Sequence, residues 1–179
     1  MAVDLVPDIA NALLSCLCGA VNQAPDPPEQ CCLRIGTQVT HDADLITDLC
    51  CTGLAYVRLG NLFPTTAFPN PDTTRQAITN CGIVSWGVEL VAGIIRCAPV
   101  GDENGNMPTC EDWTAAAVQN FYDAQSLRRM VCCFVTSVRT ISLMEGMSVI
   151  VGTQTQGDPL GGCVERSVNL TVQIPNCDC

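Results

Sequence analysis

Fourteen of the 179 residues are cysteine, and six of them form the adjacent pairs Cys31-Cys32, Cys50-Cys51 and Cys132-Cys133. Cysteine at this density is typical of small secreted domains that depend on disulfides, usually shorter than about 80 residues. This chain is longer and 47% apolar, and a domain of roughly 150 residues buries about 70% of its unfolded surface. The fold therefore does not require covalent cross-links, and we expect many of the cysteines to be small buried apolar residues.

The cysteine spacing leaves disulfides open but argues against a metal site. Adjacent cysteines on a strand point to opposite faces, so they can bond to different partners but are poorly placed to hold one ion. Structural zinc sites usually place two to four residues between paired cysteines, whereas the close pairs Cys16/Cys18 and Cys177/Cys179 have one residue between them. We predict no metal ligands, and the spacing does not define which cysteines are bonded.

The first residues do not resemble an export signal. Acidic residues and a proline stand where a signal would be basic, and polar residues interrupt the apolar run 9–18: Asp4, Pro7, Asp8, Asn11 and Ser15. No stretch reaches the 18 apolar residues that a membrane helix needs. We expect synthesis in a cytoplasm, where thiols begin reduced, and no membrane partner.

The charge excludes a nucleic-acid-binding protein. The formal net charge is −10, and all eight basic residues are arginine. Neutralising phosphates requires clustered basic residues, and the only adjacent basic pair is Arg128-Arg129. We interpret that pair as a solvated helix face or part of a salt bridge.

Hydrophobic periodicity predicts one domain, residues 1–179. Apolar residues at helical spacing predict a helix over 4–18, ended by Gly19, and a long helix over 109–138. Strands are predicted over 31–40, 50–59, 81–97, 148–153 and 164–174. Irregular stretches at 61–72 and 154–162 are candidate contact loops. We expect an α/β (α+β) fold in which a mixed, mainly antiparallel sheet is packed by the N-terminal helix and the long helix.

Three patterns predict which side chains face the core. Strand 81–97 places Val84, Trp86, Val88, Leu90, Ala92 and Ile94 on one face. In strand 164–174, Arg166 alone interrupts an apolar row. Thr109 and Asp112 resemble a capping box at the start of the long helix, whose predicted buried stripe is Trp113, Ala117, Phe121, Ala124, Leu127, Val131, Phe134 and Val138.

Support for catalysis is thin. The single histidine, His41, stands beside Asp42 and Asp44, so a thiolate, imidazole and carboxylate arrangement can be imagined with one of the cysteines. We favour a solvated loop histidine, because no nucleophile elbow, phosphate-binding loop or dinucleotide fingerprint is present. We predict that the protein is not an enzyme and that it has no catalytic residues and no cofactor. A cysteine hydrolase that uses His41 and a cysteine-rich metal or redox module are the alternatives.

Five segments occur in a recognisable order. Gly53 to Gly60 (GLAYVRLG) precedes a Phe-Pro loop, and WGVELV at Trp86 and RCAPVGD at Arg96 follow. WTAA begins at Trp113, and GGC at Gly161 precedes VNLTVQI at Val168. In this order the chain resembles the tail terminator (neck) proteins of long-tailed phages of actinobacteria, the siphophage tail terminator family.

The resemblance implies an α/β protomer with helices on a sheet. It implies assembly into a ring homo-oligomer, expected to be a hexamer, which caps the tail tube protein and joins it to the head-tail connector or stopper protein. DNA would pass through the lumen without specific binding, and an acidic bore would repel it within about 8 to 10 Å. The expected location is the neck of the virion, after assembly in the bacterial host cytoplasm. Another neck or tail-completion protein is the nearest alternative.

Overall fold

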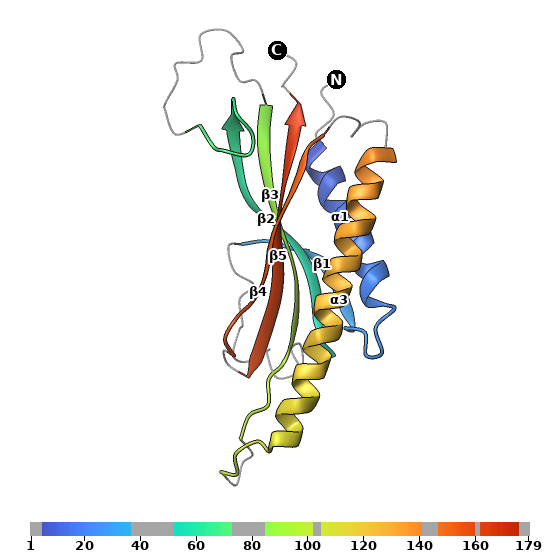
Figure 1. Ribbon diagram of the computed structural model, residues 1–179, viewed down its shortest axis with the longest axis vertical. Coiled ribbons are helices and arrows are strands. Elements are labelled where there is room, and N and C mark those ends of the chain that lie inside the picture. Colours follow the sequence, from blue (N-terminus) through green and yellow to red (C-terminus); the bar gives the residue numbers. More distant parts are fainter. Residues whose placement is uncertain are drawn as a thin grey trace.

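The computed structural model describes residues 5–36, 52–72, 85–101, 105–140, 147–159 and 162–175. Its elements follow the order α1 (Leu5–Val21), β1 (Gln30–Arg34), β2 (Leu54–Thr65), β3 (Ser85–Cys97), α3 (Cys110–Thr140), β4 (Val149–Gln156) and β5 (Cys163–Pro175). The strands form one sheet in the order β1-β2-β3-β5-β4. β1 is parallel to β2, and the other neighbours are antiparallel. Both helices lie on the same side of the sheet (Figure 1), so the predicted fold class is confirmed.

The core lies between the helices and the two central strands. On β3 the side chains of Val88, Leu90, Ala92 and Ile94 face the helices, as the alternation predicted, and Leu90 lies opposite Leu170 of β5. β5 adds Val168, Leu170 and Val172 to this cluster. Residues 81–84 of the predicted strand lie outside the described residues. The two longest strands thus form the floor on which both helices pack.

α1 continues beyond its predicted end. We predicted that Gly19 would stop the helix after Cys18, but the helix runs from Leu5 to Val21. Glycine inside a helix costs about 1 kcal/mol relative to alanine. Leu17, Ala20 and Val21 continue the buried stripe across it, and their packing offsets that cost.

β2 also extends past its predicted end. The prediction of a contact loop over 61–72 is therefore wrong for residues 61–65. We expected a strand that stops at Leu59, but pairing with β3 continues to Thr65, with a register shift between Leu59 and Leu62. β1 pairs with β2 only as far as Arg58. Beyond it, no described strand pairs with the outer edge of β2, where the N–H of Asp72 donates to the Pro64 carbonyl at 3.0 Å. An edge position tolerates a proline such as Pro64.

The second contact loop, 154–162, also begins within a strand. We predicted a strand over 148–153, but β4 runs from Val149 to Gln156. After a register shift between Val151 and Gln154, its last residues pair with β5. β1 is shorter than the predicted strand 31–40, ending at Arg34, and residues 37–40 lie outside the described residues.

α3 begins at the predicted capping box. The backbone N–H of Thr109 donates to Asp112 Oδ2 at 2.8 Å, and the N–H of Asp112 donates to Thr109 Oγ1 at 3.2 Å. The Thr109 hydroxyl also donates to Asp112 Oδ2, at 2.7 Å. The hydrogen bonds that the hydroxyl and then the backbone N–H of Thr109 donate to this carboxylate lower the pKa of Asp112. The helix has 31 residues and is therefore about 46 Å long.

Only the C-terminal half of the predicted α3 stripe is buried. Leu127, Phe134 and Val138 belong to the core, but Trp113 is 47% exposed and Phe121 is 69% exposed. The N-terminal turns of α3 extend past the end of the sheet (Figure 1). These side chains have the correct helical spacing, but the described strands do not extend beneath them.

Most cysteines of the described chain are disulfide-bonded, which corrects our expectation that the fold would use them mainly as small buried apolar residues. One disulfide joins Cys16 of α1 to Cys133 of α3, and a second joins Cys18 of α1 to Cys31 of β1. Cys97 and Cys163 are also disulfide-bonded. The free thiols of the described chain are the half-buried Cys32 and the exposed Cys110 and Cys132.

The adjacent pair on β1 behaves as its strand geometry predicted. Cys31 lies on the helix side of the sheet, where it packs against the core and bonds to Cys18. Cys32 packs on the opposite side, against the cluster of Leu54, Tyr56, Ile95 and Cys163. The two thiols therefore serve different faces of the sheet.

Candidate interaction surface

The catalytic arrangement that we considered involves His41, Asp42 and Asp44, which lie outside the described residues. Within the described ranges, no group of three or more His, Cys, Asp and Glu side chains could hold a metal ion. In the same part of the chain, no helix combines the length and hydropathy needed to cross a membrane.

A buried ion pair ties the middle of α3 to the end of β3. Arg96 Nε donates to Asp123 Oδ2 at 3.0 Å, and Arg96 Nη2 donates to Asp123 Oδ1 at 2.9 Å. Arg96 Nη2 also donates to the carbonyl oxygen of Asp26 at 2.8 Å. Arg96 and Asp123 are both buried, and this bidentate geometry is the strong form of an arginine–carboxylate contact.

Gly53 provides the space that this arginine requires. A Cβ atom at Gly53 would lie 2.8 Å from Arg96 Nη1 and 3.0 Å from the Cα atom of Pro28, and the backbone there has φ of +80°. Both the close approach and the left-handed backbone favour glycine. The absence of a side chain at Gly53 therefore leaves room for Arg96 to contact the segment before β1.

Arg166, which interrupts the apolar row of β5, forms a second polar link to α3. Its Nε donates to Asn120 Oδ1 at 2.7 Å, and its Nη2 donates to Gln156 Oε1 at 2.8 Å. Gln119 of α3 donates to the Asp26 carbonyl at 3.2 Å. The underside of α3 therefore changes from apolar to polar near residue 123.

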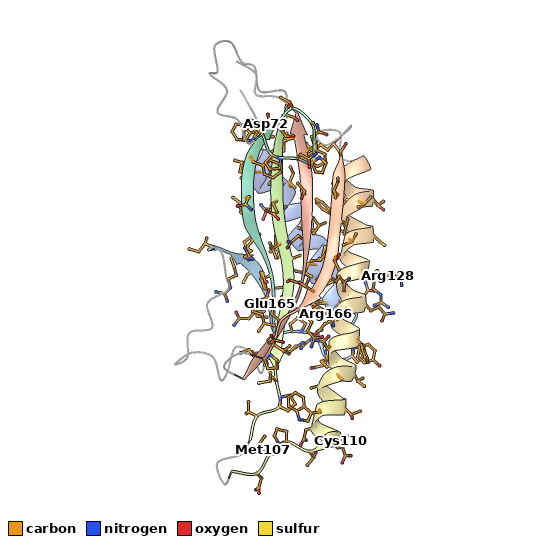
Figure 2. The ribbon with its side chains drawn as sticks, turned by 60° about the vertical axis from the view of Figure 1, so that its left-hand side comes forward. Asp72, Met107, Cys110, Arg128, Glu165 and Arg166 are labelled. Atoms are coloured by element: carbon orange, nitrogen blue, oxygen red, sulfur yellow. A yellow bond between two sulfur atoms is a disulfide. The ribbon has the colours of Figure 1, made fainter. Side chains whose placement is uncertain are left out.

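Residues 110–122 of α3, which include Gln119 and Asn120 of this polar layer, form a projecting segment that we call the arm. Its exposed large apolar side chains are Trp113, Val118, Phe121 and Tyr122, and Met107 just before the helix is 83% exposed. Figure 2 places Met107 and Cys110 at one end of the molecule and Asp72 at the other. Scattered apolar side chains are ordinary on a surface, but a group on one short segment indicates an interaction site.

A shallow hollow lies between the arm and the loops at the end of the sheet. Ala98 and Pro99 line it from the loop after β3, and Trp113 and Ala117 line it from the arm. Pro159, in the predicted contact loop 154–162, completes one side. The apolar surface of the arm thus continues onto the neighbouring loops.

The sheet face opposite the helices carries a tyrosine packed over a glycine. A Cβ atom at Gly93 would lie 2.5 Å from the hydroxyl oxygen of Tyr56, so the ring occupies the space left by the glycine. The Tyr56 hydroxyl donates to Glu165 Oε1. Burial, and then the hydrogen bond to Glu165, raises the pKa of Tyr56 well above its ordinary value.

Sequence reasoning missed the Arg96–Asp123 pair, although one signal was available. The even-numbered residues of this strand face the core, and Arg96 follows Ile94 by two positions. The alternation therefore predicts that its charged side chain points to the helix side. Such a charge requires a buried partner.

The chain matches no protein-family model and no curated protein.

Proposed function

We propose that this protein is a structural protomer of a phage neck, a tail terminator that assembles into a hexameric ring between the tail tube and the head-tail connector or stopper. The observation that carries the proposal is the arm, because it presents Trp113 and Phe121 to solvent on a helix fixed at its base by the Arg96–Asp123 pair. Exposed aromatic side chains on a rigid element are suited to a protein interface.

The fold and the charge support the same function. Helices packed on a sheet are what the sequence resemblance implied for such a protomer. A ring requires two different complementary surfaces on each copy, and the arm and the sheet face without helices differ in this way. The net charge of −10 favours a lumen through which DNA passes without binding.

Mass photometry and negative-stain electron microscopy of the purified protein, with and without reductant, test this proposal. Six chains of 19.0 kDa give about 114 kDa, and we expect particles of that mass with a closed ring shape. Phe121→Asp places a charge on the arm and is expected to shift the population to monomers. Gln125→Asp adds the same charge one helical turn away and is expected to leave the rings intact.

A protein that remains monomeric at every concentration, in both redox conditions, would contradict the proposed function. Rings that tolerate Phe121→Asp would show that assembly does not use the arm. Circular dichroism of each variant separates loss of assembly from loss of folding.

A further inference from the structure

Two arginines lie side by side on the sheet face opposite the helices. Arg34 of β1 and Arg58 of β2 are register partners in the parallel pair. Val57 belongs to the helix-side core and Cys31 packs against it. Since side chains alternate between faces along a strand, Arg58 and Arg34 point to the other face. Like charges directly opposite on neighbouring strands repel each other. The chain nevertheless places two of its eight basic residues in this arrangement.

Neither guanidinium group has an acidic partner in the described chain. The ion pairs found among the described residues are both made by Arg96. The Nε atoms of Arg34 and Arg58 are buried without a hydrogen-bond partner in that same region. A buried donor without an acceptor is costly and rare in native proteins. The Arg58 side chain hydrogen-bonds to Tyr56, but neither arginine contacts a carboxylate of the described chain, so the pair has the chemistry of a site that an external carboxylate completes.

Most described carboxylates already have partners. Asp26 and Asp123 contact Arg96, and four others bond to nearby polar groups: Asp72, Glu89, Asp112 and Glu165. The other four described acids, Asp8, Glu29, Glu111 and Asp158, make none of these contacts. Of these four, Glu111 lies on the arm, two residues from the exposed ring of Trp113.

The arm also places an aromatic ring near its carboxylate. Trp113 is exposed, and an aromatic ring binds arginine by stacking as well as by burial. One surface therefore presents two cations, and the other presents a carboxylate with an exposed aromatic ring beside it.

We propose that the Arg34–Arg58 pair is the acceptor site for the arm of a second copy of this chain, with Glu111 as the bridging carboxylate and Trp113 beside it. This inference rests on the proposed ring assembly and identifies its two complementary surfaces. The contact is heterologous, because the arm of each copy meets the sheet of the next, and such contacts close into a ring when the rotation between copies permits.

The absence of lysine from the sequence permits a selective cross-linking test. Arg58→Lys keeps the positive charge and introduces one side-chain amine. A water-soluble carbodiimide joins that amine directly to a contacting carboxylate as an amide, and the carbodiimide takes up the released water as a urea. An equal mixture of 15N-labelled and unlabelled protein identifies links between copies, because these contain one heavy and one light peptide.

We expect Arg58→Lys, and separately Arg34→Lys, to give a mixed-isotope link to the peptide that contains Glu111. Adding Glu111→Gln is expected to remove the link. Arg128→Lys is the matched control, since Arg128 points away from α3 into solvent (Figure 2), and it is expected to give no such link.

A charge exchange provides the second readout. Arg58→Glu and Glu111→Arg are each expected to weaken assembly by about tenfold or more, and the double variant is expected to recover most of the loss. Rings that form without the link and tolerate both single variants would overturn this inference while leaving the proposed function intact. A protein that forms no rings at all would overturn both.

Discussion

Of the two disulfides that join described residues to each other, the one between Cys16 and Cys133 is predicted to contribute more to the stability of the fold. It joins residues 117 positions apart, whereas the bond between Cys18 and Cys31 spans 13. In the chain-entropy model, a cross-link stabilises the folded state by restricting the unfolded chain, and the effect grows with the logarithm of the loop length. The model gives roughly 5 kcal/mol for the long loop and roughly 3 kcal/mol for the short one.

These values are large compared with the stability of a typical domain, about 5 to 15 kcal/mol. The value for the long loop is an upper limit, because Cys97 and Cys163 are also disulfide-bonded and their cross-links already restrict the unfolded chain. We expect Cys133→Ser to lower the melting temperature by roughly 10 to 20 °C. Cys31→Ser is expected to lower it by less.

Cys132→Ser is the matched control, because Cys132 is the exposed free thiol next to Cys133. Its effect should stay within about 0.5 kcal/mol, as for most surface substitutions. Urea unfolding followed by circular dichroism under non-reducing conditions gives the free energies. Equal losses for Cys132→Ser and Cys133→Ser would refute the covalent contribution, and a larger loss for Cys31→Ser than for Cys133→Ser would refute the dependence on loop length.

Three further predictions concern buried and exposed side chains. Asp123→Leu should lower the free energy of urea unfolding by about 3 to 5 kcal/mol, because it leaves Arg96 buried without its carboxylate, and adding Arg96→Met should recover most of that loss; no recovery in the double variant would contradict this explanation. Folding raises the pKa of Tyr56, so the unfolded state releases the proton near pH 10 while the folded state retains it, and the free energy of unfolding should fall above about pH 10; Tyr56→Phe should reduce this fall, and an unchanged pH profile would argue against it. Iodoacetamide under native conditions should label Cys110 before Cys32 by peptide mass spectrometry, since the first is exposed and the second half-buried; the reverse order would contradict the arrangement of β1.

The sequence predicted those parts of the fold in which local pattern and tertiary packing agree. The alternation through Val88, Leu90 and Ala92 identified the central strand and its core face, because the helices pack on one face of β3 only. Thr109 and Asp112 identified the start of α3 correctly. A capping box depends only on residues three positions apart, so it can be recognised without tertiary information.

The errors occurred where a distant part of the chain decides the outcome. Trp113 and Phe121 have the spacing of core residues, but periodicity does not reveal whether another layer lies beneath them. Gly19 and Gly60 are local stop signals, and packing along α1 and pairing with β3 carry both elements past them. The disulfide partners were equally inaccessible, because spacing along the chain does not define distance in space.

The candidate sites depended on non-local pairing in the same way. Arg166 was recognisable as a polar interruption, but its partner Asn120 lies 46 positions away. The meeting of Arg34 and Arg58 requires the parallel register of β1 and β2, which no local pattern in either strand defines. Exposed aromatic residues on a capped helix could have been proposed as an interface only after the end of the sheet was known.

The two sulfur bridges of α1 leave from residues only two positions apart and reach different layers, the long helix through Cys16 and the sheet edge through Cys18. A helix held on both sides cannot separate from the domain by itself, so its backbone amides should exchange with deuterium only when the whole molecule opens. Formation of these two disulfides therefore makes α1 one of the last segments of the domain to open.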